Sequence, residues 1–369
     1  MATILPAAPR PHPQADAELP GFRPRGQTVP LDWARLRRYL AGLGHELDLS
    51  EMPRQFAGGL ANLNYLIRLD GQPCVLRRPP PGPLPPGAND MAREHRVLSS
   101  RLWLRFPQAP RSLLYCVDPD VLGAHFLVME YRPGLTIGAD LPPWLDSRVA
   151  GPRLARTLVD LLVQLHGTDA AEVGLDHLGK PEGFLSRAID GWTRRAEALD
   201  GAAPGIAVRE LSQWLRTHCP PDARATLLHC DFKLDNIVLD PATLRPRAVL
   251  DWDMATRGHP LFDLATLLSY WTEPGDPDAV RELRQMPTTA PGFPSRAQVA
   301  EAYRRGTGCD LSDLPFHRVL AMFKLGVVFL QLHARFLAGA TTEPRYARFG
   351  HIGRSILDFT HDIARGRAS

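Results

Sequence analysis

The pattern of hydrophobic and polar positions divides this chain into a first part with strand spacing and a second part with helical spacing. In the first part, short apolar runs bounded by Gly, Asp or Pro lie at 55–57, 64–69, 74–77 and 126–129. The Asp70-Gly71 pair between two of these runs predicts a tight hairpin turn. Helical spacing occurs at 31–43 and 90–101. A small antiparallel sheet with neighbouring helices is therefore expected.

Helical spacing dominates the chain after about residue 135. Helices are expected at 149–166, 319–338 and 346–364, where apolar residues recur every three or four positions. The apolar runs 237–239 and 248–250 interrupt this pattern, and the turn-forming residues 240–243 between them predict a β-hairpin. The expected fold class is α+β, with a small antiparallel-sheet N-lobe and a mainly helical C-lobe.

Composition refines this division. Residues 1–30 are rich in Pro, Ala and Arg without periodicity, which predicts a disordered leader before an N-lobe at 31–134 and a C-lobe at 135–369. The net charge of +3 is spread without a basic tract, so neither nucleic acid nor an anionic membrane is an expected partner. The oligomeric state has no signal in the sequence.

Cysteine usage and hydropathy suggest a compartment. The five cysteines are scattered without a C-x-x-C pair, which argues against a zinc site or a disulfide framework and suits a reducing cytoplasm. The longest apolar stretch, 320–332, is interrupted by Lys324 and Gln331, so no membrane span is expected. A cytoplasmic protein is the resulting expectation.

Candidate chemistry is concentrated in the segment 229–236, which reads His-Cys-Asp-Phe-Lys-Leu-Asp-Asn, and in Asp251. Phosphoryl transfer requires a carboxylate that orients the attacking hydroxyl, plus oxygen ligands for magnesium on the nucleotide phosphates. Asp231 fits the first role, and Asn236 and Asp251 fit the second, because the predicted hairpin folds them toward one another. Lys233 is expected to reach the transferred phosphate.

Two other interpretations of this segment remain open. The Asp and Asn residues can simply cap turns around a buried hairpin, as isolated residues of these types usually do. Cys230 can be read as a nucleophile with His229 as its base. A small Cys is expected to be tolerated at position 230 unless the backbone there requires a positive φ.

The segments VLRRPPPG, REHRVL, HCDFKLDN and VLDWDMATRGHPLFDLA resemble the aminoglycoside phosphotransferase superfamily, whose usual pattern is H-G-D-x-x-x-x-N followed by I-D-W. They look most like the kinase domains related to those fused to certain acyl-CoA dehydrogenases, family members 10 and 11. The resemblance covers about residues 31–364, and it departs from the pattern at Cys230, where the family usually has Gly. It implies a protein-kinase-like fold that uses ATP and Mg²⁺.

The resemblance also implies roles for individual residues. In the C-lobe, His229 would pack beneath the loop and Asp263 would brace it through backbone hydrogen bonds, although Asp263 can also be an ordinary first-turn acid. In the N-lobe, the nucleotide contacts would come from Gly58, Gly59, Asn62, Glu130 and Tyr131. A plain hairpin turn at the Gly pair and a plain strand end at Glu130 are the alternatives.

The N-lobe cation departs from the kinase pattern because no lysine precedes Lys180. Arg77 occupies the strand position that usually holds a phosphate-binding lysine, and Glu94 is its expected helix partner. The alternatives are that Arg77 and Arg78 are surface charges and that Glu94 is an exposed helix acid. The Pro-rich segment 79–87 is expected to be a stiff spacer or a lid.

The acceptor is the least specified part. Arginines at least match the acids beyond residue 264, which disfavours a polycationic antibiotic. The resemblance implies a hydroxy acid or hydroxyacyl-CoA acceptor for an ATP- and Mg²⁺-dependent O-kinase. An antibiotic or amino-alcohol kinase and a non-catalytic nucleotide-binding pseudokinase are the alternatives.

Overall fold

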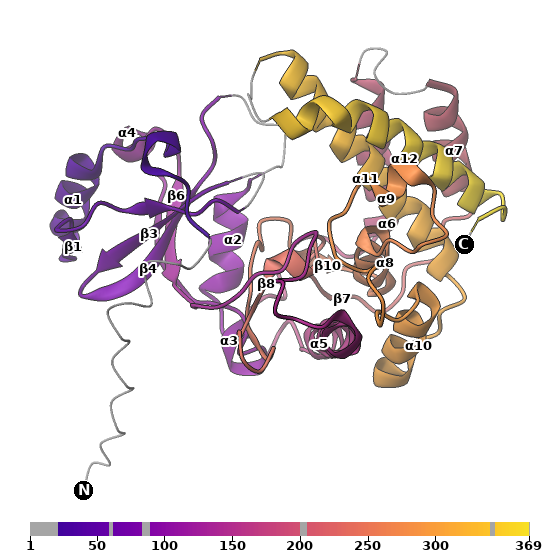
Figure 1. The fold of residues 1–369 in the computed structure, drawn as a ribbon, viewed down its shortest axis with the longest axis horizontal. Helices are drawn as coiled ribbons and strands as arrows, with labels where there is room; N and C mark the ends of the chain where they lie inside the picture. Colours follow the sequence, from indigo (N-terminus) through magenta and orange to yellow (C-terminus); the bar gives the residue numbers. More distant parts are fainter. Residues whose placement is uncertain (1–20, 59–61, 83–88, 200–204, 340–343, 369) are drawn as a thin grey trace, which may run out of the picture. The chain divides into compact units, whose positions relative to one another are not determined.

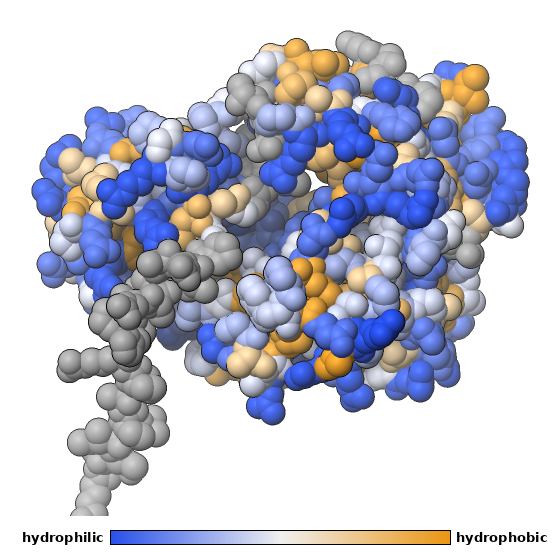
Figure 2. Space-filling view, in the orientation of Figure 1, coloured by the Kyte–Doolittle hydropathy of each residue, from blue (hydrophilic) through white to orange (hydrophobic). Residues whose placement is uncertain are grey.

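The computed structural model describes residues 21–58, 62–82, 89–199, 205–339 and 344–368 (Figure 1). Contacts divide the chain into two units, one formed by Met1–Pro81 with Leu113–Tyr131 and the other by Gly82–Ser112 with Arg132–Ser369. Most of the predicted leader lies outside the described residues. Hydrophilic residues cover most of the visible surface of each unit, and hydrophobic side chains form small groups among them (Figure 2).

The first unit is built on an antiparallel sheet. Its strands in the described residues are β1 (Leu47–Asp48), β2 (Arg54–Gln55), β3 (Leu63–Leu69), β4 (Gln72–Arg78), β5 (Ser112–Cys116) and β6 (Phe126–Glu130). The strand order is β1-β3-β4-β6-β5, with β2 paired to β3. Asp70 and Gly71 join β3 to β4 with φ values of 50° and 73°. Two successive positive φ values are the geometry that the Asp-Gly pair predicted.

Helix α1 (Trp33–Gly42) covers part of this sheet, and α4 (Pro119–Leu122) and the 3₁₀ turn η1 (Arg25–Gln27) complete the unit. The side chain of Asp32 caps α1 by accepting a hydrogen bond from the Arg35 backbone. Leu36 and Leu40, one turn apart on α1, are fully buried in the same cluster as Tyr65 of β3. The apolar face of α1 therefore closes the core of the unit.

The second unit is mainly helical. Its helices are α2 (Met91–Leu98), α3 (Leu102–Arg105), α5 (Ser147–His166), α6 (Phe184–Glu197), α7 (Gly205–Thr217), α8 (Leu261–Tyr270), α9 (Asp278–Arg281), α10 (Arg296–Thr307), α11 (Leu314–Leu337) and α12 (Phe349–Ala364), with 3₁₀ turns η2 (Leu234–Asn236) and η3 (Pro344–Arg348). Two short antiparallel ladders join β7 (Thr226–Leu228) to β10 (Thr256–Gly258), and β8 (Ile237–Leu239) to β9 (Pro246–Val249). The predicted hairpin is confirmed, with its second strand starting two residues earlier than expected.

Helix α11 forms the centre of this unit, where it packs against α8 and α12. Within the described part of the chain, it alone is long and apolar enough to cross a membrane by length and composition. Most of its residues are buried among its neighbours, and Lys324 lies in its middle. A core helix of a water-soluble protein has these same properties.

Candidate active site

The segment 229–236 forms a loop between β7 and β8, and helix α8 is hydrogen-bonded to the start of this loop. Asp263, in the first turn of α8, is fully buried. Its Oδ2 accepts a hydrogen bond from the His229 backbone N–H at 2.6 Å, and its Oδ1 accepts one from Cys230 at 2.7 Å. Burial would raise the pKa of Asp263, but His166, His229 and these hydrogen bonds lower it. One ionised carboxylate thus positions two successive backbone amides of the loop.

His229 connects this loop to the segment that carries Asp251. Its Nε2 donates to the Leu250 carbonyl at 2.9 Å, and its Nδ1 accepts from the Asp231 backbone N–H at 3.3 Å. The Leu250 backbone N–H in turn donates to the Asn236 carbonyl at 2.8 Å. These contacts bring the backbone beside Asp231, Asn236 and Asp251 together in one place.

Asp231 lies in a cluster of polar groups at the end of the loop. Its Oδ1 accepts a hydrogen bond from the Tyr270 hydroxyl at 2.7 Å. Its Oδ2 accepts from the Asn236 side-chain amide at 3.2 Å and lies 3.4 Å from the Lys233 ammonium. Burial alone would raise the pKa of Asp231, but the charges of Lys233 and Lys324 and the Tyr270 hydrogen bond lower it. The carboxylate is therefore held ionised.

Lys233 is shared between two carboxylates. Its Nζ lies 3.1 Å from Asp235 Oδ1 and 3.4 Å from Asp231 Oδ2, and its side chain is 10% exposed. Burial would lower the pKa of Lys233, yet Asp231 and Asp235 raise it well above the usual value. A permanent positive charge consequently sits beside Asp231, where a transferred phosphoryl group would carry negative charge.

The backbone at Cys230 corrects one expectation. Cys230 has a φ of 66°, so this position does require the left-handed conformation that Gly adopts most easily. Its side chain is 4% exposed, and burial together with Asp263 raises the pKa of its thiol. A protonated, buried thiol cannot act as the nucleophile, so that interpretation of Cys230 is wrong. The Lys324 ammonium donates to the Cys230 carbonyl.

Asn236 and Asp251 present oxygen ligands that suit a magnesium ion. The Asn236 amide nitrogen donates to the Asp231 carbonyl at 2.8 Å and to its Oδ2, which leaves the amide oxygen as the group available to a cation. Asp251 has a φ of 70°, an unusual conformation for Asp, and its charge affects the pKa of both Lys233 and Asp235. Two hard oxygen ligands match the one or two protein ligands that Mg²⁺ usually takes beside nucleotide phosphates.

Glu94 of α2 contacts the segment that follows Asp251. Glu94 is fully buried, so the interpretation as an exposed helix acid is wrong. Its Oε1 accepts a hydrogen bond from the Trp252 backbone N–H at 3.2 Å. Arg93, its neighbour on α2, donates to the Asp253 carbonyl at 3.3 Å. Helix α2 thereby holds the backbone on the carboxyl side of Asp251, and the expected pairing of Glu94 with Arg77 stays a prediction.

In the first unit, the two arginines at the end of β4 are both buried, so neither is a surface charge. Arg77 is 7% exposed and its guanidinium lies 3.4 Å from the Asn64 side-chain oxygen. Arg78 donates to the carbonyls of Pro79 and Leu122, which ties β4 to the last residue of α4. Arg78 is thus occupied within the fold.

The other predicted nucleotide contacts are placed as follows. Asn62 is buried just before β3, and Glu130 ends β6, paired with Cys74 of β4. The Tyr131 ring lies 6.1 Å from that of Phe56, while a Cβ at Gly58 would meet no neighbouring atom. Gly59 lies outside the described residues, as does most of the Pro-rich segment.

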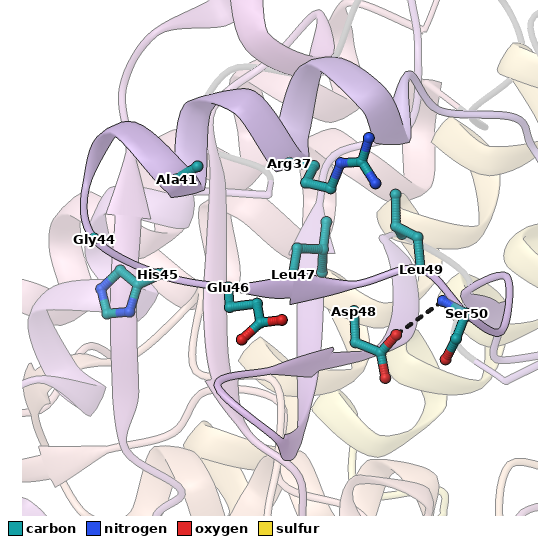
Figure 3. Close-up of a pocket in the computed structure, with 9 residues that line it drawn as sticks. All are labelled: Arg37, Ala41, Gly44, His45, Glu46, Leu47, Asp48, Leu49 and Ser50. Carbon is teal, nitrogen blue, oxygen red and sulfur yellow. Dashed lines mark hydrogen bonds between the residues drawn. The ribbon is translucent and has the colours of Figure 1, made fainter.

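A surface groove of about 780 Å³ lies between α1 and β1 of the first unit (Figure 3). Its lining includes Arg37 from the helix and His45, Asp48 and Ser50 from the chain that follows, and Asp48 is bound by the Ser50 backbone N–H. The groove shares no residue with the predicted nucleotide contacts.

The sequence alone assigned no role to four residues near this loop. Tyr270 and Lys324 contact the loop, His166 contacts Asp263, and Tyr303 contacts His166. His166 lies 3.4 Å from Asp263 Oδ2 and 2.8 Å from the Tyr303 hydroxyl. One signal was available for Lys324, since a charge in the middle of an otherwise apolar helix needs a buried partner. The other three have no such signal, because Tyr270 ends an apolar helix and His166 and Tyr303 occupy ordinary helix positions.

The braced loop presents an ionised carboxylate beside a lysine, and Asn236 and Asp251 lie at the two ends of the hairpin that follows. This arrangement is the one expected of a kinase-like phosphotransferase. The model of the phosphotransferase enzyme family APH matches residues 53–301, and the chain belongs to this family. The family acts by phosphoryl transfer to hydroxyl groups, so this chain is a phosphotransferase for an alcohol acceptor.

Known relatives agree with this assignment. Acyl-CoA dehydrogenase family member 11 from Homo sapiens is 32% identical over 332 residues, which cover 88% of this chain and 41% of that protein. The chain thus spans about two fifths of the length of that relative. A solved structure from Ralstonia eutropha, assigned as an aminoglycoside phosphotransferase, shares the fold with a TM-score of 0.71 and 24% identity, covering 91% of this chain and 99% of that one.

A second solved structure contains a nucleotide. Aminoglycoside phosphotransferase APH(4)-Ia, in a complex with AMP-PNP and hygromycin B, has a TM-score of 0.56 and 17% identity, over 90% of this chain and 99% of that one. At these identities the two structures establish the fold. They confirm the predicted α+β, kinase-like fold class.

Proposed function

We propose that this chain is an ATP- and Mg²⁺-dependent small-molecule O-kinase that phosphorylates the hydroxyl of a hydroxy acid or hydroxyacyl-CoA. The observation that carries the kinase mechanism is the environment of Asp231. This carboxylate is kept ionised on a braced loop, beside Lys233 and Asn236, and the loop is hydrogen-bonded to Leu250, the neighbour of Asp251. Such an arrangement can orient an acceptor hydroxyl and stabilise the charge of the transferred phosphoryl group.

In the proposed reaction, Asp231 takes the proton of the acceptor hydroxyl while the acceptor oxygen attacks the γ-phosphorus. The bond to the β,γ-bridging oxygen breaks, and its electron pair stays on ADP. Lys233 stabilises the charge on the transferred group. Asn236 and Asp251 would hold Mg²⁺, which supplies charge neutralisation on the phosphates. The proposed nucleotide contacts of the first unit are Gly58, Gly59, Asn62, Arg77, Glu130 and Tyr131.

The acceptor assignment rests on the relatives and on charge. The chain is similar to one part of acyl-CoA dehydrogenase family proteins, whose name implies a role in acyl-CoA oxidation. Phosphorylating a hydroxyl would turn it into a leaving group and so prepare a hydroxylated acid for elimination. The arginines beyond residue 264, which at least match the acids there in number, also disfavour a polycationic acceptor. An antibiotic or amino-alcohol kinase is the alternative. It is supported by the APH(4)-Ia structure, which has a similar fold and contains hygromycin B.

The test is Mg²⁺-dependent ADP release from ATP by the purified protein. The acceptors are 3-, 4- and 5-hydroxy acids and their CoA thioesters, with kanamycin and choline for comparison. Stimulation by a hydroxyacyl compound supports the proposal, whereas stimulation by kanamycin or choline alone replaces the acceptor. Asp231→Asn should lower kcat by roughly 10²- to 10⁴-fold with ADP affinity retained. Nucleotide binding without any turnover would instead favour a pseudokinase.

A further inference from the structure

Tyr270 is a buried tyrosine whose hydroxyl lies against the carboxylate of Asp231. Its side chain is 8% exposed, and the 2.7 Å contact with Asp231 Oδ1 is the shortest of the side-chain contacts that the structure gives this carboxylate. Lys233 lies over the Tyr270 ring, with its Nζ 5.4 Å from the ring centroid. The hydroxyl of Tyr270 thus contacts Asp231, the proposed proton acceptor. Its ring lies beside Lys233, which is proposed to stabilise the transferred phosphoryl group.

Helix α8 explains how Tyr270 reaches this position. Residues seven apart in an α-helix lie on the same face, two turns from one another. Asp263 and Tyr270 are seven apart, at the two ends of α8. Asp263 binds the backbone of the loop at 229 and 230, and Tyr270 binds the side chain of the next residue. One face of a single rigid helix therefore fixes both the loop backbone and its carboxylate.

The two carboxylate oxygens are consequently not equivalent. Oδ1 receives the short hydrogen bond from Tyr270, whereas Oδ2 has the longer contacts to Asn236 at 3.2 Å and Lys233 at 3.4 Å. A phenol that donates to Oδ1 restricts the rotation of the Asp231 side chain and leaves Oδ2 as the oxygen with the more distant partners. Oδ2 is thus the oxygen placed to receive the proton of the acceptor.

We propose that Tyr270 is a positioning residue for catalysis, which orients Asp231 so that Oδ2 faces the acceptor hydroxyl. This inference rests on the proposed function, because it assigns to Asp231 the role of proton acceptor. Tyr270 acts through Asp231 and does not itself exchange a proton with the substrate. Removing its hydroxyl should therefore slow the chemical step and leave nucleotide binding intact.

The experiment compares Tyr270→Phe with Tyr65→Phe. Tyr65 is a fully buried tyrosine of β3 whose hydroxyl donates to the Val29 carbonyl, so Tyr65→Phe removes a buried hydrogen bond elsewhere. Tyr270→Phe should lower kcat by roughly 10- to 100-fold, which is the range expected for one hydrogen bond to a charged group. The KM for ATP and the ADP affinity should stay close to those of the parent protein, and Tyr65→Phe should keep the kcat of the parent protein.

A double-mutant cycle tests whether Tyr270 acts through Asp231. In an Asp231→Asn background, Tyr270→Phe should change the residual turnover by less than about twofold, because the group it positions is no longer present. An equal fold-loss in both backgrounds would overturn the inference. So would an unchanged kcat in Tyr270→Phe, or a loss of ADP affinity that parallels the loss of kcat. If Tyr270→Phe does not fold, Tyr270→Met supplies the same comparison.

The outcome for the parent protein separates this inference from the proposed function. ATP hydrolysis to water gives a measurable turnover if no acceptor in the panel reacts, and the same variants can be compared in that assay. A parent protein that neither transfers nor hydrolyses would overturn the proposed function and the role of Tyr270 together. A parent protein with normal turnover and an unaffected Tyr270→Phe variant would overturn only the role of Tyr270.

Discussion

His317 predicts a specific loss of stability in mild acid. Its ring is fully buried in α11, and its Nδ1–H donates to the Asp313 carbonyl at 3.0 Å. Its Nε2 has no hydrogen-bond partner within the described part of the chain, and the ring of His259 lies 4.3 Å away. Burial and the neighbouring His259 lower the pKa of His317 to about 3, although the Asp313 carbonyl opposes this shift.

The sign follows from proton binding in the two states. Below a pH of about 6.5 the unfolded chain protonates this histidine, whereas the folded protein does not until about pH 3. Proton binding therefore lowers the free energy of the unfolded state as the pH falls through this window, and the folded protein becomes less stable. From pH 7.5 to pH 5.0, one such group contributes a loss of about 2 kcal/mol. Both pH values lie well above the folded-state pKa, so the unfolded-state pKa dominates this figure.

The assay is urea unfolding, followed by tryptophan fluorescence, at pH 7.5 and pH 5.0. His317→Asn keeps a donor for the Asp313 carbonyl but cannot be protonated in this range. Its free energy of unfolding should fall by about 2 kcal/mol less than that of the parent protein over the same interval. Burial also lowers the pKa of His259 and of His95, and their contributions remain in both proteins. An equal fall in both proteins would refute the argument.

Three further substitutions test the support of the loop. Cys230→Gly should have a thermal midpoint at least as high as Cys230→Ala, because glycine adopts a φ of 66° without strain, and a clearly higher midpoint for the alanine variant would contradict this. Asp263→Asn replaces one of the two accepting oxygens with an NH₂ group, which cannot accept the backbone hydrogen bond. The free energy of unfolding in urea should fall by about 1–3 kcal/mol. Lys324→Met leaves the Cys230 carbonyl without its donor, and a loss of similar size is expected, whereas an unchanged midpoint would show that this contact contributes little.

The sequence predicted the features whose signals are local. The Asp70-Gly71 turn, the hairpin of β8 and β9 and the long C-terminal helices follow from turn chemistry and hydrophobic period, which neighbouring residues set. The approach of Asn236 to Asp251 also follows from local sequence, because the hairpin of β8 and β9 folds the chain back on itself. The resemblance to a known family was strongest over the same residues.

Other features could not be predicted because they depend on backbone conformation or on contacts far apart in the chain. The positive φ at Cys230 is imposed by the loop, and the residue itself does not reveal it. Glu94 is buried and contacts Trp252, a residue 158 positions away in the chain. The hydrogen bond from Tyr270 to Asp231 spans 39 positions, and a tyrosine at the end of an apolar helix is usually core.

By itself, then, the sequence determined the fold class and the phosphotransferase family, and it proposed the groups for phosphoryl transfer, because period, turn residues and motif spacing are properties of nearby positions. Only the tertiary structure decided how these groups are oriented and charged. The ionisation of Asp231 and Lys233 results from burial balanced against neighbouring charges, and those neighbours come from α8, α11 and the loop itself. Only packing brings those elements together. No local sequence pattern therefore reveals that the Tyr270 hydroxyl donates to Oδ1 of Asp231.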